Sequence, residues 1–177
     1  MNRDQLEHVL RAASTIVDET DVLVIGSQAV LGSIPDDQLP PEATTSIEAD
    51  LAFFDDPDDE KADRVDGAIG ELSTFHETYG YYAQGVSVST AALPVGWRDR
   101  LVILATPNTA PARGLCLEPH DCVVSKLVAY RPKDLDFAAA LLREHLVDPD
   151  VLVDRIELLP SPTAVKDRLR AWVKRHR

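Results

Sequence analysis

Hydrophobic residues in the first third of the chain recur first at helical spacing and then in short runs typical of buried strands. Apolar runs over 22–25 and 47–54 predict two strands, and residues 28–31 predict a short helix that ends at Gly32. Residues 33–45 contain three prolines and predict a loop. A helix is expected before the first strand, with Asn2 and Gln5 placed to cap its start. Its apolar face consists of Leu6, Val9, Leu10, Ala13, Ile16 and Val17.

The rest of the chain changes from mixed to helical patterning. The acidic segment 55–60 is placed to begin a helix that continues at helical spacing to Leu72. Residues 75–106 look rich in strands, with candidates at 81–83, 86–88 and 101–105 and a turn over 93–97. From Pro119 onward the pattern is helical, and three prolines suit first helical positions, the last two preceded by possible caps: Pro119, Pro149 after Asp148, and Pro162 after Ser161.

These elements predict a single α/β (α+β) domain over residues 1–177. A small mixed sheet with flanking helices is expected over 1–110, and a helical C-terminal portion over 115–177. A hydrophobic content of 45% is typical of a folded chain with a substantial core. No apolar run approaches the ~18 residues of a membrane span, and the N-terminal residues lack a signal-like apolar segment. We therefore expect a cytoplasmic protein that does not contact membranes.

Charge is distributed unevenly. The net charge is −12, yet residues 164–177 carry six basic side chains and one acidic one. An acidic body repels nucleic acid over most of its surface, whereas a basic tail favours local contact with a polyanion. The alternative is that the tail is simply the solvated face of a helix.

Two histidine-containing segments are further candidate sites. Cys116, His120 and Cys122 have zinc-capable side chains but neither a fourth ligand nearby nor a standard finger spacing, so two half-buried thiols are expected instead. His76 precedes a glutamate, and a structural histidine is expected there in preference to a site residue.

Two carboxylates separated by one residue are the main chemical signal. On an extended strand Glu48 and Asp50 share one face, about 6.6 Å apart along the chain. Two such carboxylates favour a divalent cation, which prefers oxygen ligands. A turn at Gly26 and Ser27 is placed to present backbone N–H groups to phosphate. The combination predicts metal-dependent chemistry on a nucleotide, unless the acids line the solvent face of an edge strand.

The order of strand, glycine-serine turn, short helix and acid-bearing strand is that of the nucleotidyltransferase fold. Four stretches add to the likeness: Thr45–Leu51, Leu93–Leu101, Glu118–Asp121 and Ser125–Asp134. Over residues 20–145 the chain resembles the minimal bacterial nucleotidyltransferases, especially uncharacterised nucleotidyltransferase-like families related to AbiEii-type toxins.

This resemblance implies a transferase that moves NMP from an NTP to a tRNA or protein acceptor with Mg²⁺ or Mn²⁺. It implies that Glu48 and Asp50 bind the metal and act in catalysis, and that Gly26 and Ser27 hold the phosphates. It further implies a toxin acting beside an antitoxin. Three residues of the later helix take roles by the same resemblance: Lys126 neutralises the leaving pyrophosphate, Arg131 assists it, and Asp134 orients Lys126 or the nucleophile.

The sequence departs from the family pattern at two points. The first acid of the pair is Glu48, where many relatives have aspartate, and the expected third acid on a neighbouring strand is missing from 101–105, with only Asp99 at its edge. A non-catalytic nucleotide-binding or regulatory protein that retains the fold is therefore the alternative. Lys126 as a surface lysine, and Arg131 with Asp134 as a helical ion pair, are further alternatives, and a purely architectural likeness predicts no nucleotide binding.

Overall fold

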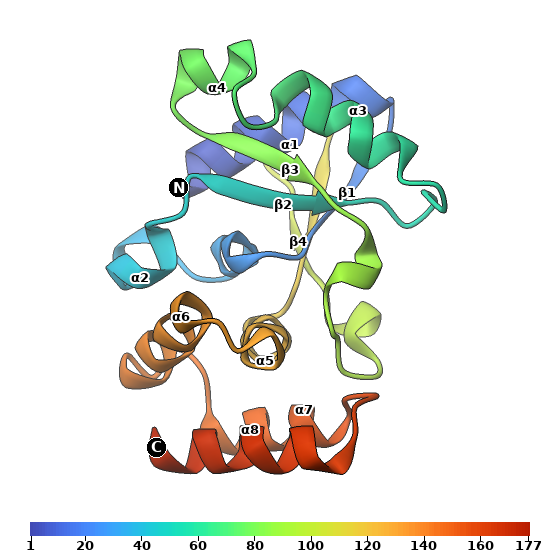
Figure 1. Ribbon diagram of the computed structural model, residues 1–177. Coiled ribbons are helices and arrows are strands. Elements are labelled where there is room, and N and C mark those ends of the chain that lie inside the picture. Colours follow the sequence, from blue (N-terminus) through green and yellow to red (C-terminus); the bar gives the residue numbers. More distant parts are fainter.

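A five-stranded mixed sheet runs through the computed structural model, which describes all residues 1–177 (Figure 1). The strand order is β3-β2-β1-β5-β4. β1 pairs antiparallel with β2 and parallel with β5, while β2 pairs parallel with β3 and β4 antiparallel with β5. The sheet consists of β1 (Asp21–Val24), β2 (Glu48–Ala52), β3 (Tyr82–Gly85), β4 (Val102–Leu104) and β5 (Arg113–Cys116).

Helices cover both faces of this sheet (Figure 1). One face is covered by α1 (Arg3–Val17), α3 (Glu60–Ile69) and α4 (Thr74–Tyr79). The predicted cap of α1 is confirmed, because the Asn2 side chain accepts from the Gln5 backbone and the Gln5 side chain from the Asn2 backbone.

The other face of the sheet lies toward the C-terminal helices (Figure 1). Against it lie the short helix η1 (Ser27–Gly32) and the helices α2 (Pro41–Thr44), α5 (Pro119–Ala129) and α6 (Pro132–Arg143). Beyond them, α7 (Pro149–Glu157) and α8 (Thr163–Arg175) form an outer layer (Figure 1). Three further single turns are η2 (Asp36–Gln38), η3 (Val88–Thr90) and η4 (Trp97–Arg100). The predicted fold class, a mixed sheet with helices and a helical C-terminal third, is confirmed.

One continuous apolar core joins the sheet to the C-terminal helices. It includes Leu23 and Leu51 on the strands, Leu127 on α5, and Leu169 on α8, all of which are almost completely buried. Burying such side chains supplies most of the stabilising free energy of a domain. None of the helices is both long and apolar enough to cross a membrane.

A buried carboxylate fixes the C-terminal helices to the turn before β4. Asp121, fully buried on α5, accepts two hydrogen bonds from Arg100, at 2.8 Å and 3.1 Å, and lies 3.2 Å from Arg155 of α7. The two guanidinium groups offset the cost of burying this charge. Asp121 is therefore part of the structural frame behind the site.

Several predicted elements differ from the structure. The predicted loop over 33–45 includes η2 and α2, and the predicted strand at 86–88 is absent because the chain leaves the sheet after Gly85. Residues 74–79 are helical because the Ser73 side chain caps their start and Gly80, at φ 76°, ends them. At the last helix, Pro162 itself is the cap residue, so Ser161 does not cap α8 as predicted.

β5 was not predicted, although it lies between two other strands. Its Gly114 packs against α1, where a Cβ atom would be 2.6 Å from Leu10 Cδ1. Glycine fits this position because of the close packing, but glycine has a low strand propensity, so the sequence of 113–116 does not indicate a strand.

Candidate active site

The acid pair lies on an inner strand of the sheet. β2 has β1 on one side and β3 on the other, so the alternative of an edge strand facing solvent is wrong. Its burial alternates, with Ala49 and Leu51 in the core and Glu48 and Asp50 partly accessible on the opposite face. The i, i+2 spacing therefore places both carboxylates on the face that η1, α5 and α6 cover.

The glycine-serine turn lies directly beside the second acid. The backbone N–H of Ile25 donates to Asp50 O at 3.1 Å, which fixes the end of β1 against β2. A Cβ atom on Gly26 would lie 2.7 Å from Asp50 Cγ and closer still to Oδ2, so only glycine leaves room for this carboxylate. The Cys122 thiol donates to Gly26 O at 3.5 Å and ties the turn to α5.

The two carboxylates interact strongly. Burial and the neighbouring Glu48 together raise the pKa of Asp50 to about 6, although Lys126 and Lys133 act to lower it. Tyr82 donates its hydroxyl to Glu48 Oε2 at 2.8 Å, and burial together with this bond raises the pKa of Tyr82. The hydroxyl of Tyr82 thus orients the Glu48 carboxylate in the pocket wall.

A cluster of charges from α5 and α6 forms the opposite wall. Asp134 is buried and accepts from Arg131 Nε at 2.6 Å and from a second Arg131 nitrogen at 3.2 Å. Lys126 Nζ lies 3.9 Å from Asp134 Oδ1, and its side chain is only 15% exposed. The ion pair between Arg131 and Asp134 is thus present as the structural alternative predicted, but it also lies in the wall of the pocket.

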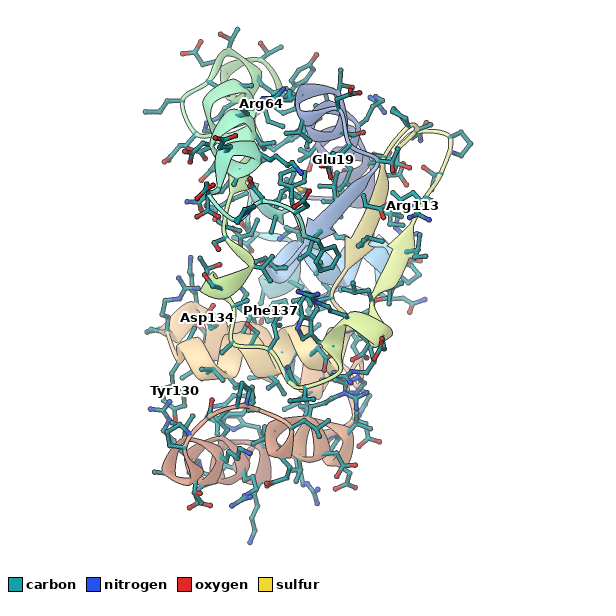
Figure 2. The ribbon with its side chains drawn as sticks, turned by 90° about the vertical axis from the view of Figure 1, so that its right-hand side faces the viewer. Glu19, Arg64, Arg113, Tyr130, Asp134 and Phe137 are labelled. Carbon is teal, nitrogen blue, oxygen red and sulfur yellow. The ribbon has the colours of Figure 1, made fainter.

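A pocket of about 510 Å³ lies between these two walls, large enough for a nucleotide-sized ligand. Figure 2 shows Asp134 and Phe137 on the side of α6 that faces the sheet, with Tyr130 lying toward the outer helices. Six of the predicted site residues line the pocket together: Ser27, Glu48, Asp50, Lys126, Arg131 and Asp134. Gly26 does not line it but supports Asp50 from behind.

The pocket also contains residues that the sequence did not single out. Gln84 and Lys133 both line it, as do Ser125 and Phe137. Lys133 directly precedes the predicted site residue Asp134, and this adjacency in sequence could have identified it as a candidate site residue. Gln84 lies beside Asp50 in the parallel register of β2 and β3, and only that register identifies it.

The predicted strand at 101–105 is not the neighbour of β2, the strand that carries Glu48 and Asp50. Residues 102–104 form β4 at the far edge of the sheet, separated from β2 by β1 and β5. Asp99, beside that strand, is exposed and does not line the pocket. The strand next to the acids is β3, and its residue opposite Asp50 is the neutral Gln84.

His76, His120 and the two cysteines have structural roles. The His76 ring packs on Tyr82 at 4.7 Å and its Nδ1 accepts from the Leu72 N–H, outside the pocket. Both cysteines are fully buried free thiols, more enclosed than the half-buried state expected. Both ring nitrogens of His120 are in use, because Nδ1 bonds Glu118 at 2.6 Å and Nε2 accepts from the Asp148 N–H at 2.9 Å.

The donor set of the pocket suits a hard divalent cation. Mg²⁺ is commonly held by one or two carboxylates together with substrate phosphates and water. Glu48 and Asp50 supply the two carboxylates, and the close approach of Gly26 leaves the Asp50 oxygens beside the turn. No group of three or more histidine, cysteine, aspartate or glutamate side chains comes together anywhere in the chain as a metal site.

Comparison with known proteins gives one family. Residues 4–166 match a family described as "Nucleotidyltransferase of unknown function (DUF6036)", and the matched range includes every residue of the pocket. No curated protein and no solved structure matches the chain.

Proposed function

The chain belongs to this nucleotidyltransferase family, and from that premise we propose that it transfers NMP from an NTP to an acceptor hydroxyl in the pocket between β2 and α5. The observation that carries the proposal is the pairing of two carboxylates, Glu48 and Asp50, with the Lys126 ammonium across one nucleotide-sized pocket. Paired carboxylates bind the cation of such sites, and an ammonium group stabilises developing phosphate charge.

Each side chain has a defined task in this proposal. Glu48 and Asp50 hold Mg²⁺ or Mn²⁺, which would supply charge neutralisation on the triphosphate when bound. Lys126 and Arg131 face the leaving pyrophosphate, and Asp134 holds both cations in position. Ser27 lies at the start of η1 beside the acids, where its hydroxyl and backbone are placed to bind phosphate.

The chemistry is a displacement at the α-phosphorus. The acceptor oxygen forms the new O–P bond, the bond between the α-phosphorus and the bridging oxygen breaks, and pyrophosphate departs with the electron pair. The acceptor hydroxyl releases its proton to solvent. Most of the catalytic gain in such a reaction comes from positioning and from electrostatic stabilisation.

The acceptor is proposed to be tRNA or a protein, as for a toxin with a partner antitoxin. The basic C-terminal helix gives limited support to RNA. Arg170 pairs with Glu157 and Asp167, Arg177 pairs with Asp150, and Arg168 lies over the Tyr130 ring at 4.2 Å. Lys174 and Arg175 remain exposed.

A second candidate function is nucleotide binding without transfer. The neutral Gln84 beside Asp50 favours it, since a third acid on the neighbouring strand would be expected in an active relative. Incubation with each α-labelled NTP, Mg²⁺ and total RNA or cell lysate separates the two functions. Transfer of label that Asp50→Asn abolishes supports the enzyme, while tight NTP binding without labelled product supports the binding protein.

A further inference from the structure

The strand beside the acid pair contributes no negative charge to the pocket. In the parallel register of β2 and β3, Glu48 lies next to Tyr82 and Asp50 next to Gln84. Neighbours in register share one face of a sheet, and both Gln84 and Asp50 line the pocket. The position from which a third carboxylate would reach the site is therefore occupied by an uncharged amide.

The remaining acids of the pocket are already paired. Asp134 accepts from Arg131 at 2.6 Å and lies near Lys126, and Glu42 lies 3.3 Å from Arg143. An aspartate that is buried and shared between two cations is a poor ligand for a further ion. Glu48 and Asp50 are thus the two carboxylates left for metal.

Two ammonium groups line the pocket with them. Lys126 projects from α5 with its side chain mostly buried, and Lys133 projects from the first turn of α6. Two ammonium groups, two carboxylates and one divalent cation sum to about +2, whereas two divalent cations among three carboxylates sum to about +1. One divalent cation beside these lysines therefore already supplies at least as much positive charge as a two-cation site. A second divalent ion would bring excess positive charge without a ligand set to hold it.

We propose that the site works with one divalent cation, that Lys126 stands in the place of a second one, and that Gln84 is the residue that sets this number. This proposal rests on the proposed function and deepens it. A two-cation site needs a carboxylate that bridges or adds ligands for ions about 3.5–4 Å apart, and Gln84 offers only a neutral carbonyl oxygen.

The test counts ions in the full-length protein with a non-reacting substrate. Mn²⁺ is titrated in the presence of the α,β-methylene analogue of each NTP, and bound Mn²⁺ is measured by equilibrium dialysis and electron paramagnetic resonance. We expect one Mn²⁺ per chain with an uncoupled spectrum. Gln84→Glu adds the missing carboxylate at nearly constant volume, and we expect two ions per chain with a spin-coupled spectrum.

Control variants make each result decisive. Gln38→Glu changes the same side chain on the exposed turn η2 and is expected to leave one ion bound. Lys126→Met is expected to weaken binding of the analogue about tenfold or more, because it removes the substitute charge. Two coupled ions in the native chain overturn this inference and leave the proposed function intact. Absence of any bound Mn²⁺ overturns the proposed function itself, and one ion in Gln84→Glu overturns the role of Gln84.

Discussion

Gly26 and Asp50 pack so closely that the Asp50 carboxylate lies where a side chain of residue 26 would begin. A Cβ atom there would be 3.0 Å from Asp50 Cβ and 2.7 Å from Cγ. The Gly26 backbone is extended, with φ −83° and ψ −169°, a conformation open to any residue. The glycine is therefore required by the acid beside it and not by its own dihedral angles.

Gly26→Ala is expected to disrupt the metal site. The added methyl group displaces the Asp50 carboxylate, so Mn²⁺ affinity falls about tenfold, and overpacking costs about 1–3 kcal/mol of unfolding free energy. Calorimetric titration with Mn²⁺ and urea denaturation measure the two effects. The control is Gly67→Ala in α3, where no atom lies within 4 Å of the new Cβ and stability should rise by about 0.5–1 kcal/mol. Unchanged Mn²⁺ affinity in Gly26→Ala contradicts the assignment.

Asp50→Asn is expected to stabilise the metal-free protein while removing metal binding. The pKa of Asp50 is raised to about 6, so this carboxyl adds stability below its ordinary pKa of 3.8 and loses it as the pH rises through 6. The neutral amide avoids that loss, and we expect a gain on the order of 1 kcal/mol at pH 7.5 that vanishes near pH 4.

Urea denaturation in the presence of a chelator, at both pH values, measures this difference. A stability difference that is equal at pH 4 and pH 7.5 would mean that ionisation of Asp50 is not its cause.

Metal affinity is expected to depend on pH through the same carboxyl. Because the pKa of Asp50 is about 6 and a cation needs the ionised form, Mn²⁺ affinity should rise between pH 5 and 7, by up to about tenfold per pH unit below 6. Above pH 7 the affinity should level off. Titration calorimetry in buffers of different ionisation enthalpy counts the proton released, and a flat profile over pH 5–7 speaks against Asp50 as a ligand.

Asp134→Asn is expected mainly to lower the stability of the protein, whereas Lys126→Ala is expected mainly to slow transfer. Asp134→Asn leaves Arg131 and the mostly buried Lys126 without a counter-charge, which costs about 2 kcal/mol or more of unfolding free energy. Lys126→Ala removes charge from the site of the leaving group and should slow transfer about a hundredfold with a smaller loss of stability. Thermal unfolding and the labelled-NTP assay, run side by side, measure both. A Lys126→Ala variant that loses activity only by unfolding assigns the lysine to structure alone.

Asp121→Ala is expected to destabilise the fold without changing the number of bound ions. The substitution leaves Arg100 and Arg155 without their shared buried partner, which costs about 3–5 kcal/mol. Urea denaturation measures the loss of unfolding free energy, and equilibrium dialysis under native conditions measures the number of bound Mn²⁺ ions. Asp99→Ala, at an exposed aspartate of η4, should change neither. Equal stability of both variants contradicts the structural role of Asp121.

Local spacing made the acid pair predictable. The i, i+2 relation of Glu48 and Asp50 depends only on strand geometry, and the capped start of α1 depends only on neighbouring residues. Lys126 and Asp134 were reached through the order of motifs, because no local rule brings a helix of residues 119–129 to β2.

The missed features depend on long-range pairing. Gln84 enters the site through the register of β2 with β3, and β5 is placed by its pairing with β1, with Gly114 masking its strand pattern. The assumption that residues 101–105 lie next to the acids was wrong for the same reason, since strand order is not encoded in local periodicity. The structural role of Asp121 likewise depends on Arg100 and Arg155, which lie far from it in sequence.

The pairing of β1 with β5 also bears on the order in which the site is expected to form during folding. β1 closes against β5 across 92 residues, a contact marked by the bond from Arg113 Nε to Asp21 at 2.7 Å, and α5 begins three residues after β5 ends. Non-local strand pairings of this kind form slowly, so we expect Lys126 to reach the acids only after β1 and β5 have paired. Cation binding is consequently a property of the fully folded chain, and its appearance in a refolding experiment should follow the slowest phase of sheet formation.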